Sequence, residues 1–213
     1  MLFIGTALYE NKVSTNYLHG LMQTTNALNR HNIEVEYAFE RGTYIAINRE
    51  KLVRRFMKTN NPYFLFIDAD TSFTAKNVLD LLSTDVEVIS GLYSYRMQVD
   101  NPVKHCFRNM KGEAIDTSVA APIQECAFVP TGMLLIRRSV FEQLYTKHEF
   151  IFDQGFRNSE YFKALWGNDG DELMARFEGE DCHFCKIWHD MGGKMFVNPN
   201  VRVGHIGEYV YNV

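Results

Sequence analysis

Two carboxylates at positions i and i+2 follow an apolar run in this sequence. Residues 63–67 (Tyr-Phe-Leu-Phe-Ile) end at Asp68, and Asp70 comes two positions later. At the end of a buried strand both side chains can reach one divalent cation. Carboxylate oxygens suit Mg²⁺ or Mn²⁺, which also bind diphosphate oxygens. Acids also commonly begin loops, but a core strand that delivers two of them is costly unless something pairs with them.

Three other places carry side chains that could act beside such a cation. Glu180 and Asp181 begin a helical pattern, where acids either complement the helix dipole or serve as acid/base groups. His205 has glycine neighbours that allow close approach to a ligand, although a lone histidine in a late strand is often structural. An imidazole ligand would favour Mn²⁺ over Mg²⁺. Trp166 suits stacking on an acceptor sugar, or ordinary packing.

The cysteines suggest packing more than metal binding. Cys182 and Cys185 form a C-x-x-C pattern around His183, but zinc would need further ligands, and Cys106 and Cys126 form no second close pair. Two small helix residues packed against a sheet are the better interpretation. Four cysteines in a chain of this size indicate thiols in a reducing compartment.

The elements that must position these residues alternate strand and helix in the first part of the chain. Apolar runs and alternation predict strands, and helical spacing predicts helices, the first of them capped by Ser14 or Thr15. The predicted strands are 2–7, 33–39, 63–67 and 86–89, and the predicted helices are about 15–28, 45–57 and 76–82. This order favours a mostly parallel sheet with helices on both faces, in which ligands bind beyond the carboxyl ends of the strands. Asp68 and Asp70 lie at such an end.

The rest of the chain is less regular. Residues 93–127 suggest a hairpin insertion, and residues 150–179 a loop-rich lid or acceptor region. A strand at 133–136, a helix at 180–191 and two short strands at 194–197 and 201–203, on either side of an Asn-Pro-Asn turn, complete the predicted elements. No repeat or linker is visible, so we expect one domain over residues 1–213.

Composition narrows the possible partners and location. The chain has 213 residues, 46% of them apolar, which is enough for one well-buried α/β domain. Its formal net charge is −4 and it has no run of Lys and Arg, so we expect no nucleic-acid partner. No apolar stretch reaches the roughly 20 residues that span a bilayer, and the N-terminus lacks the features of a signal peptide. These features predict a soluble intracellular protein.

Five segments, in order along the chain, resemble the motifs of GT-A glycosyltransferases. Residues 6–9 (Thr-Ala-Leu-Tyr) end the first strand, and residues 66–70 match the family's D-x-D motif. Residues 130–134 resemble the small-residue turn beneath the donor sugar, residues 179–181 the x-E-D motif, and residues 203–205 the late histidine that completes the metal shell. The resemblance covers nearly the whole chain, which is also similar to the N-terminal domain of a glycosyltransferase from a large chlorella virus.

The resemblance implies a Rossmann-like GT-A domain over 1–213, with 1–92 as the nucleotide-binding half and 93–213 as the donor-sugar and acceptor half. The implied reaction is transfer of a hexosyl unit from a UDP-sugar to a carbohydrate hydroxyl, aided by Mn²⁺ or Mg²⁺. The implied partners are a UDP-sugar and a glycan acceptor, with no nucleic acid and no membrane span. The expected location is the cytoplasm, or the host cytoplasm for a viral protein, and the chain could be part of a longer multidomain protein.

The resemblance also implies roles for individual residues. Asp70 and His205 would ligate the metal, and Asp68 would bind the metal, the ribose or the donor sugar. Asp181 would deprotonate the acceptor in an inverting enzyme, whereas in a retaining enzyme a nearby carboxylate, Glu180 or Asp181, would shield or attack a cationic intermediate. The remaining implied donor-binding residues are Thr6, Ala7, Tyr9, Asn48, Arg49 and Gly132.

Arg49 departs from the family pattern. Many relatives have Ala-Arg-Asn where this chain has Ala-Ile-Asn-Arg over residues 46–49, so the basic residue is displaced. A solvated arginine on a helix face is therefore the alternative to contact with uracil or phosphate.

Other classes remain open at this stage. A haloacid-dehalogenase-like phosphatase would use Asp68 as its nucleophile, and Lys163 and residues 168–171 loosely mimic its later motifs. Against it, Ser72 stands where Thr or Val is expected, and the D-x-D follows two strand–helix units. A sugar-nucleotide pyrophosphorylase should show a Gly-rich, Arg-containing loop, which residues 6–12 lack. A non-catalytic module that binds nucleotide sugars would share every motif.

Overall fold

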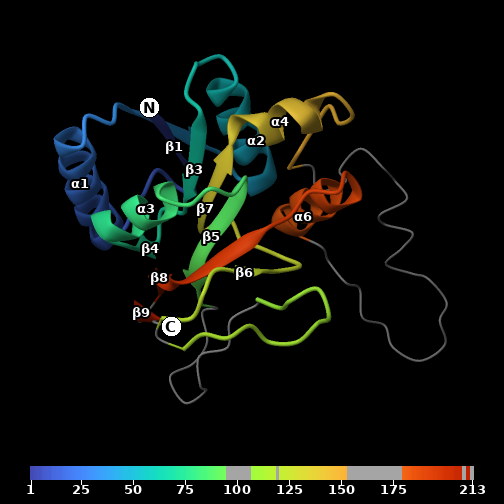
Figure 1. Cartoon of the computed structure of the whole chain (residues 1–213). Coiled ribbons are helices and arrows are strands. Elements are labelled where there is room, and N and C mark those ends of the chain that lie inside the picture. The colour runs from blue at the N-terminus through green and yellow to red at the C-terminus, as the bar shows by residue number, and fades with distance from the viewer. Residues whose placement is uncertain (95–106, 119, 153–178, 208–209, 212–213) are drawn as a thin grey trace.

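The computed structural model describes residues 1–94, 107–118, 120–152, 179–207 and 210–211. Figure 1 shows a central sheet with helices against both faces. The strands are β1 (Leu2–Leu8), β2 (Val35–Arg41), β3 (Tyr63–Ile67), β4 (Thr71–Ser72), β5 (Val88–Tyr93), β6 (Gln124–Glu125), β7 (Met133–Arg137), β8 (Phe196–Ile206) and β9 (Val210–Tyr211). The helices are α1 (Thr15–Arg30), α2 (Ile45–Phe56), α3 (Ala75–Leu82), α4 (Arg138–Tyr145) and α6 (Glu180–Asp190).

The sheet is mixed, with one antiparallel strand inserted at its centre. Among the described residues the strand order is β2-β1-β3-β7-β5-β8-β4, and β6 and β9 also pair with β8. Strands β1, β2, β3, β5 and β8 run in one direction, and β7 opposes its neighbours β3 and β5. The expected α/β class, with a mostly parallel GT-A-like sheet, flanking helices and a smaller antiparallel part, is confirmed. The carboxyl end of β3 lies next to the first residue of β7, because Ile67 pairs with Met133.

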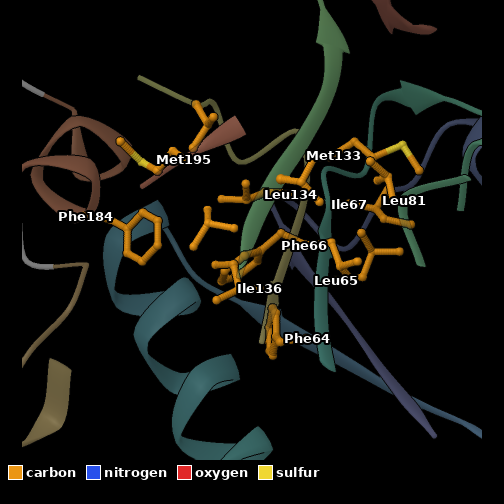
Figure 2. Close-up of a cluster of buried hydrophobic side chains, with 14 of the residues drawn as sticks. Phe64, Leu65, Phe66, Ile67, Leu81, Met133, Leu134, Ile136, Phe184 and Met195 are labelled. Carbon is orange, nitrogen blue, oxygen red and sulfur yellow. The ribbon is translucent and has the colours of Figure 1, made fainter. Parts of the chain in front are cut away.

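Alternation within β3 decides which helices cover each face of the sheet. Phe64 packs against Phe56 of α2 and Phe141 of α4, at centroid distances of 5.2 and 5.8 Å. Successive side chains of a strand point to opposite faces, so Leu65 and Ile67 face the other side, where Figure 2 shows them beside Leu81 of α3. Burial of both faces explains why the whole run from residue 64 to residue 67 is apolar.

Local signals begin and end the helices as their chemistry predicts. Ser14 caps α1 by accepting the Tyr17 N–H at 3.0 Å, and Thr74 forms a reciprocal capping box with Asn77 at the start of α3. Gly192 follows α6 with a φ of +83°, a conformation that a side chain would disfavour.

The prediction of two short strands on either side of Asn198-Pro199-Asn200 was wrong. One strand, β8, runs through this segment, and its register against β5 shifts between Gly91 and Leu92, whose partners are Asn198 and Arg202. An irregularity of this kind accommodates a proline, which cannot donate to the ladder. The short strands β4, β6 and β9 and the helix α4 were not predicted.

The less regular parts of the chain are described only partly. Arg108 pairs with Ala114 in an isolated antiparallel bridge, while residues 95–106 of the expected hairpin insertion lie outside the described residues. Most of the expected lid, residues 153–178, lies outside them as well. Among the helices that the structure describes, none combines the length and the apolarity that a membrane crossing requires.

Candidate active site

The acidic segment from Asp68 to Asp70 follows β3 directly and is held by backbone hydrogen bonds on three sides. The Asp68 N–H donates to the Gly132 carbonyl at the start of β7, at 3.1 Å. The carbonyl of the intervening alanine accepts the Ser14 N–H at 2.9 Å, and that of Asp70 accepts the Ile206 N–H at 2.8 Å. The two carboxylates therefore project from a backbone fixed by β7, by the start of α1 and by β8.

Gly132 occupies a position where a side chain would collide with Tyr93 unless one of the two moved. A Cβ atom there would lie 2.4 Å from Cζ of Tyr93, a contact that real Cβ atoms do not make. The Gly132 carbonyl also accepts the hydroxyl of Thr71 at 3.1 Å, in addition to the Asp68 N–H. Gly132 thus fixes the position of the acidic segment, and its expected place beneath a donor sugar stays a prediction.

Asp70 and His205 lie side by side. The His205 Nε2 atom is 3.5 Å from Asp70 Oδ2, and His205 Nδ1 lies 3.1 Å from the carbonyl oxygen of Ser94. A carbonyl only accepts, so Nδ1 carries a proton, and Nε2 is the ring nitrogen on the side of the carboxylate. The ring also packs on Tyr93, with centroids 4.7 Å apart.

These residues fit a divalent cation that a diphosphate helps to hold. Within the described ranges no group of three or more His, Cys, Asp and Glu side chains is placed to hold a metal. Mg²⁺-type ions, however, are usually bound by one or two protein ligands together with substrate phosphates and water. Ligands about 2.1 Å from one octahedral ion lie roughly 3 Å apart, so a small adjustment would bring Asp70 and His205 to a common ion.

Arg49 is a buried ion-pair partner of both acidic motifs, which are residues 68–70 after β3 and residues 180–181 at the start of α6. Its Nη2 donates to Asp68 at 3.0 Å from Oδ1 and 3.3 Å from Oδ2, and its Nη1 pairs with Glu180 Oε1. The side chains of Arg49, Asp68 and Glu180 are 6%, 26% and 9% exposed. The interpretation of Arg49 as a solvated helix-face arginine was therefore wrong. One guanidinium joins α2, the end of β3 and the first turn of α6.

Glu180 and Asp181 share the first turn of α6 but differ in their surroundings. Arg49 pairs directly with Glu180, whereas the Asp181 carboxylate accepts the N–H of Cys182 at 2.9 Å. Burial raises the pKa of Asp181, and the nearby guanidinium of Arg49 opposes that shift only in part. A carboxylate with a raised pKa is a stronger base when ionised, so Asp181 is the better suited of the two to take up a proton.

The residues expected to bind the nucleoside fall into two groups. Thr6 and Asn48 are buried and serve the framework, since the Thr6 hydroxyl bonds to Tyr17 at 2.6 Å and the Asn48 amide donates to the Gly42 carbonyl at 3.0 Å. Ala7 is also buried, whereas Tyr9, directly beyond β1, is 68% exposed. Among Thr6, Ala7 and Tyr9, Tyr9 is the one with a face available for stacking.

The remaining predictions concern the C-x-x-C pattern and residues of the less regular parts of the chain. Cys185 is buried and its thiol contacts the backbone of Val129, with Sγ 3.5 Å from both N and O. Burial raises its pKa well above the ordinary value for a thiol, which supports packing over metal binding. Trp166 lies outside the described residues, as do Lys163, Cys106 and residues 168–171.

Two neighbours of the site were not predicted as such from the sequence. Tyr17 was predicted only as part of a helix pattern, yet its hydroxyl bonds to Thr6, and burial raises the pKa of Tyr17 to about 12. The helical spacing marked it as buried, and a buried phenol needs a polar partner. The Ser94 carbonyl that orients His205 carries no sequence signal, because any residue there has a carbonyl.

Comparisons with known proteins support the fold. No protein-family model and no curated protein matches the sequence. Among solved structures, A197 from STIV is 15% identical, with a TM-score of 0.57 over 97% of this chain and 85% of that chain. A glycosyltransferase involved in the glycosylation of the major capsid of PBCV-1 is 10% identical, with a TM-score of 0.40 over 84% of this chain and 78% of that chain.

A third similar structure is a complex with ligands. A Drosophila β1,4-galactosyltransferase 7 variant, in complex with manganese, UDP-Gal and xylobiose, is 14% identical, with a TM-score of 0.38 over 67% of this chain and 51% of that chain. At identities this low, similarity between structures shows a shared fold and no more. The match to A197 from STIV extends over nearly the whole chain.

Proposed function

We propose that this chain is a metal-dependent glycosyltransferase that moves a hexosyl unit from a UDP-sugar to a hydroxyl of a glycan. The observation that carries the proposal is the pair formed by Asp70 and His205 at the carboxyl end of β3, with the His205 tautomer fixed by a backbone carbonyl. Ligands of α/β sheets bind beyond such strand ends. The similar structure with manganese and UDP-Gal supports this choice of cation and donor.

Each acidic residue has a distinct part in the proposed reaction. Asp70 and His205 would hold Mn²⁺ or Mg²⁺, which would supply positive charge to neutralise the departing nucleoside diphosphate. Asp68, kept in place by Arg49, faces the ribose or the donor sugar. Asp181 takes the proton from the acceptor hydroxyl as the new glycosidic bond forms.

The phosphatase alternative receives less support from the geometry. A nucleophilic Asp68 would need its charge available for attack on phosphorus, but Arg49 Nη2 lies 3.0 and 3.3 Å from its two oxygens and lowers their nucleophilicity. A non-catalytic nucleotide-sugar module remains the competing reading, and it differs only in that it lacks turnover.

Thermal unfolding with nucleotides tests the binding half of the proposal. A ligand at about 100 times its Kd stabilises the folded state by about 2.7 kcal/mol, which raises Tm by roughly 5–10 °C in a chain of this size. We expect that shift with UDP or a UDP-hexose in the presence of Mn²⁺, and little shift with either alone. Asp70→Asn should abolish the shift, whereas the matched control Asp190→Asn, at an exposed acid on α6, should retain it.

Turnover separates an enzyme from a binding module. Asp181→Asn should keep the Mn²⁺-dependent shift with UDP but lose transfer and donor hydrolysis, measured as UDP release across a panel of UDP-hexoses. Metal-independent UDP binding that survives in Asp70→Asn would refute the site. Phosphate release from phosphomonoesters would favour the phosphatase instead.

A further inference from the structure

Glu50, the residue after Arg49 in α2, is a buried carboxylate that plays no part in the proposed reaction. It is 5% exposed, and its two oxygens accept hydrogen bonds from three segments. Oε1 accepts the Tyr145 hydroxyl of α4 at 2.6 Å and Arg54 Nε at 3.3 Å. Oε2 accepts the backbone N–H groups of Ile151 at 2.9 Å and Phe152 at 3.2 Å. A buried charge is tolerated only with partners of this kind.

The hydrogen-bond donors around Glu50 match an ionised carboxylate. Burial raises the pKa of Tyr145, with the negative charge of Glu50 as the next cause, so the phenol keeps its proton and donates it. The backbone N–H groups of Ile151 and Phe152 can only donate. A carboxamide at this position would place its NH₂ group, itself a donor, either against Arg54 Nε or against the N–H groups of Ile151 and Phe152. Both orientations therefore bring two donors together.

Glu50 accepts a hydrogen bond from the backbone of Phe152. The Phe152 ring in turn contacts β3 and α6, the two elements that carry the acidic motifs. Its ring stacks on Phe184 of α6, with centroids 5.2 Å apart and an interplanar angle of 12°. It also meets Phe66 of β3 edge-on, again at 5.2 Å. Phe66 lies two residues before Asp68, and Phe184 lies three residues after Asp181, on an adjacent turn of the helix.

We propose that Glu50 is a positioning residue for the proposed transferase: through Phe152 and Phe184 it fixes the first turn of α6 and thereby aims Asp181 at the acceptor hydroxyl. Glu50 touches neither donor nor acceptor in this role. It works together with Arg49, which ties the same turn of α6 to Asp68. Two consecutive residues of α2 thus hold α6, Arg49 directly by charge and Glu50 through an aromatic contact.

The inference rests on the proposed function, and kinetics of Glu50→Gln test it first. Misplacement of a reacting group by about 1 Å costs up to about 100-fold in rate, so we expect kcat to fall by about 10- to 100-fold. Mn²⁺-dependent UDP binding should stay within about twofold, because the segment from Asp68 to Asp70 keeps its backbone hydrogen bonds to Gly132, Ser14 and Ile206. The matched control is Glu142→Gln, at a 55% exposed glutamate of α4, which should leave both quantities unchanged.

A second readout does not depend on turnover. Cys182 follows Asp181 in the first turn of α6 and is partly exposed, whereas Cys126 and Cys185 are buried. Alkylation of Cys182, followed by peptide mass spectrometry, therefore reports the order of that turn. We expect it to be severalfold faster in Glu50→Gln than in the wild type or in Glu142→Gln. Phe152→Leu, which cuts the link while keeping Glu50, should show the same kinetic and labelling changes and replaces Glu50→Gln if that variant does not fold.

The outcomes separate the positioning role from the proposed function. Wild-type kcat in folded Glu50→Gln, or in Phe152→Leu, would overturn the positioning role even if transfer itself is established. If the wild type transfers no sugar at all, the proposed function fails and the labelling rate alone decides. Faster labelling then upholds the link from Glu50 to α6, and an unchanged rate overturns it.

Discussion

Replacing Arg49 with Met tests the idea that one guanidinium compensates two buried carboxylates. Loss of one partner of a buried ion pair costs about 3–5 kcal/mol, because the other charge is left without compensation. The Glu180 side chain is 9% exposed and should contribute most of that cost, while Asp68, at 26%, is more strongly screened by solvent. We therefore expect a loss of about 3 kcal/mol in Arg49→Met, near the lower end of the range.

Urea unfolding at pH 7, followed by tryptophan fluorescence, measures this loss. A matched control on the same helix is Arg55→Met, because Arg55 also pairs with a carboxylate, Glu40, but its side chain is 50% exposed. Exposed pairs contribute about 0–1 kcal/mol. In a chain of this size, 3 kcal/mol corresponds to a drop of roughly 6–12 °C in Tm.

A double variant makes the test sharper. In Arg49→Met with Glu180→Gln, the carboxylate left uncompensated is removed as well, so much of the lost stability should return. If Arg49→Met is no less stable than Arg55→Met, or if Glu180→Gln restores nothing, the buried ion-pair cluster does not hold these three elements together.

Further predictions concern the residues around this cluster. Asp181→Asn should be more stable than the wild type at pH 7. Because burial raises the pKa of Asp181, ionisation costs stability as pH rises. The gain should vanish below the ordinary aspartate range, and a gain that is constant from pH 3 to pH 8 would contradict this reasoning. Gly132→Ala should lower stability by about 1–3 kcal/mol in chemical denaturation, because the new Cβ meets the Tyr93 ring, and an unchanged midpoint would contradict it. Tyr17→Phe should cost about 1–2 kcal/mol by the same measurement, because the buried Thr6 hydroxyl loses its partner, and a neutral result would show that Thr6 finds another.

The sequence predicted the elements best where local pattern and burial agree. The run from Phe64 to Ile67 is apolar on both faces because helices cover both sides of β3, and it stops where the strand reaches the edge of the sheet. The change from apolar to acidic at Asp68 therefore marked the end of the strand, and ligand binding there stays a prediction. By contrast, Pro199 looked like a turn, because local propensity cannot show that a neighbouring strand tolerates a shift of register.

Sequence patterns could not predict the burial and the roles of residues that pair with distant parts of the chain. Arg49 and Arg55 lie on the same helix, yet one is buried against Asp68 and Glu180 and the other is half exposed. No local pattern separates them, because the acids that pair with Arg49 belong to β3 and α6. Glu50 was overlooked for the same reason, since the N–H groups that it accepts lie beyond α4.

The antiparallel insertion of β7 has a consequence for biosynthesis. The backbone carbonyl that restrains Asp68 comes from Gly132, and the imidazole beside Asp70 comes from β8, so a growing polypeptide displays both aspartates well before either neighbour has been synthesised. Until then the carboxylates stand hydrated at the end of an incomplete sheet, without the histidine that later lies beside Asp70. An interrupted translation product would thus carry the acidic motif without the backbone restraint from Gly132 and without the neighbouring His205.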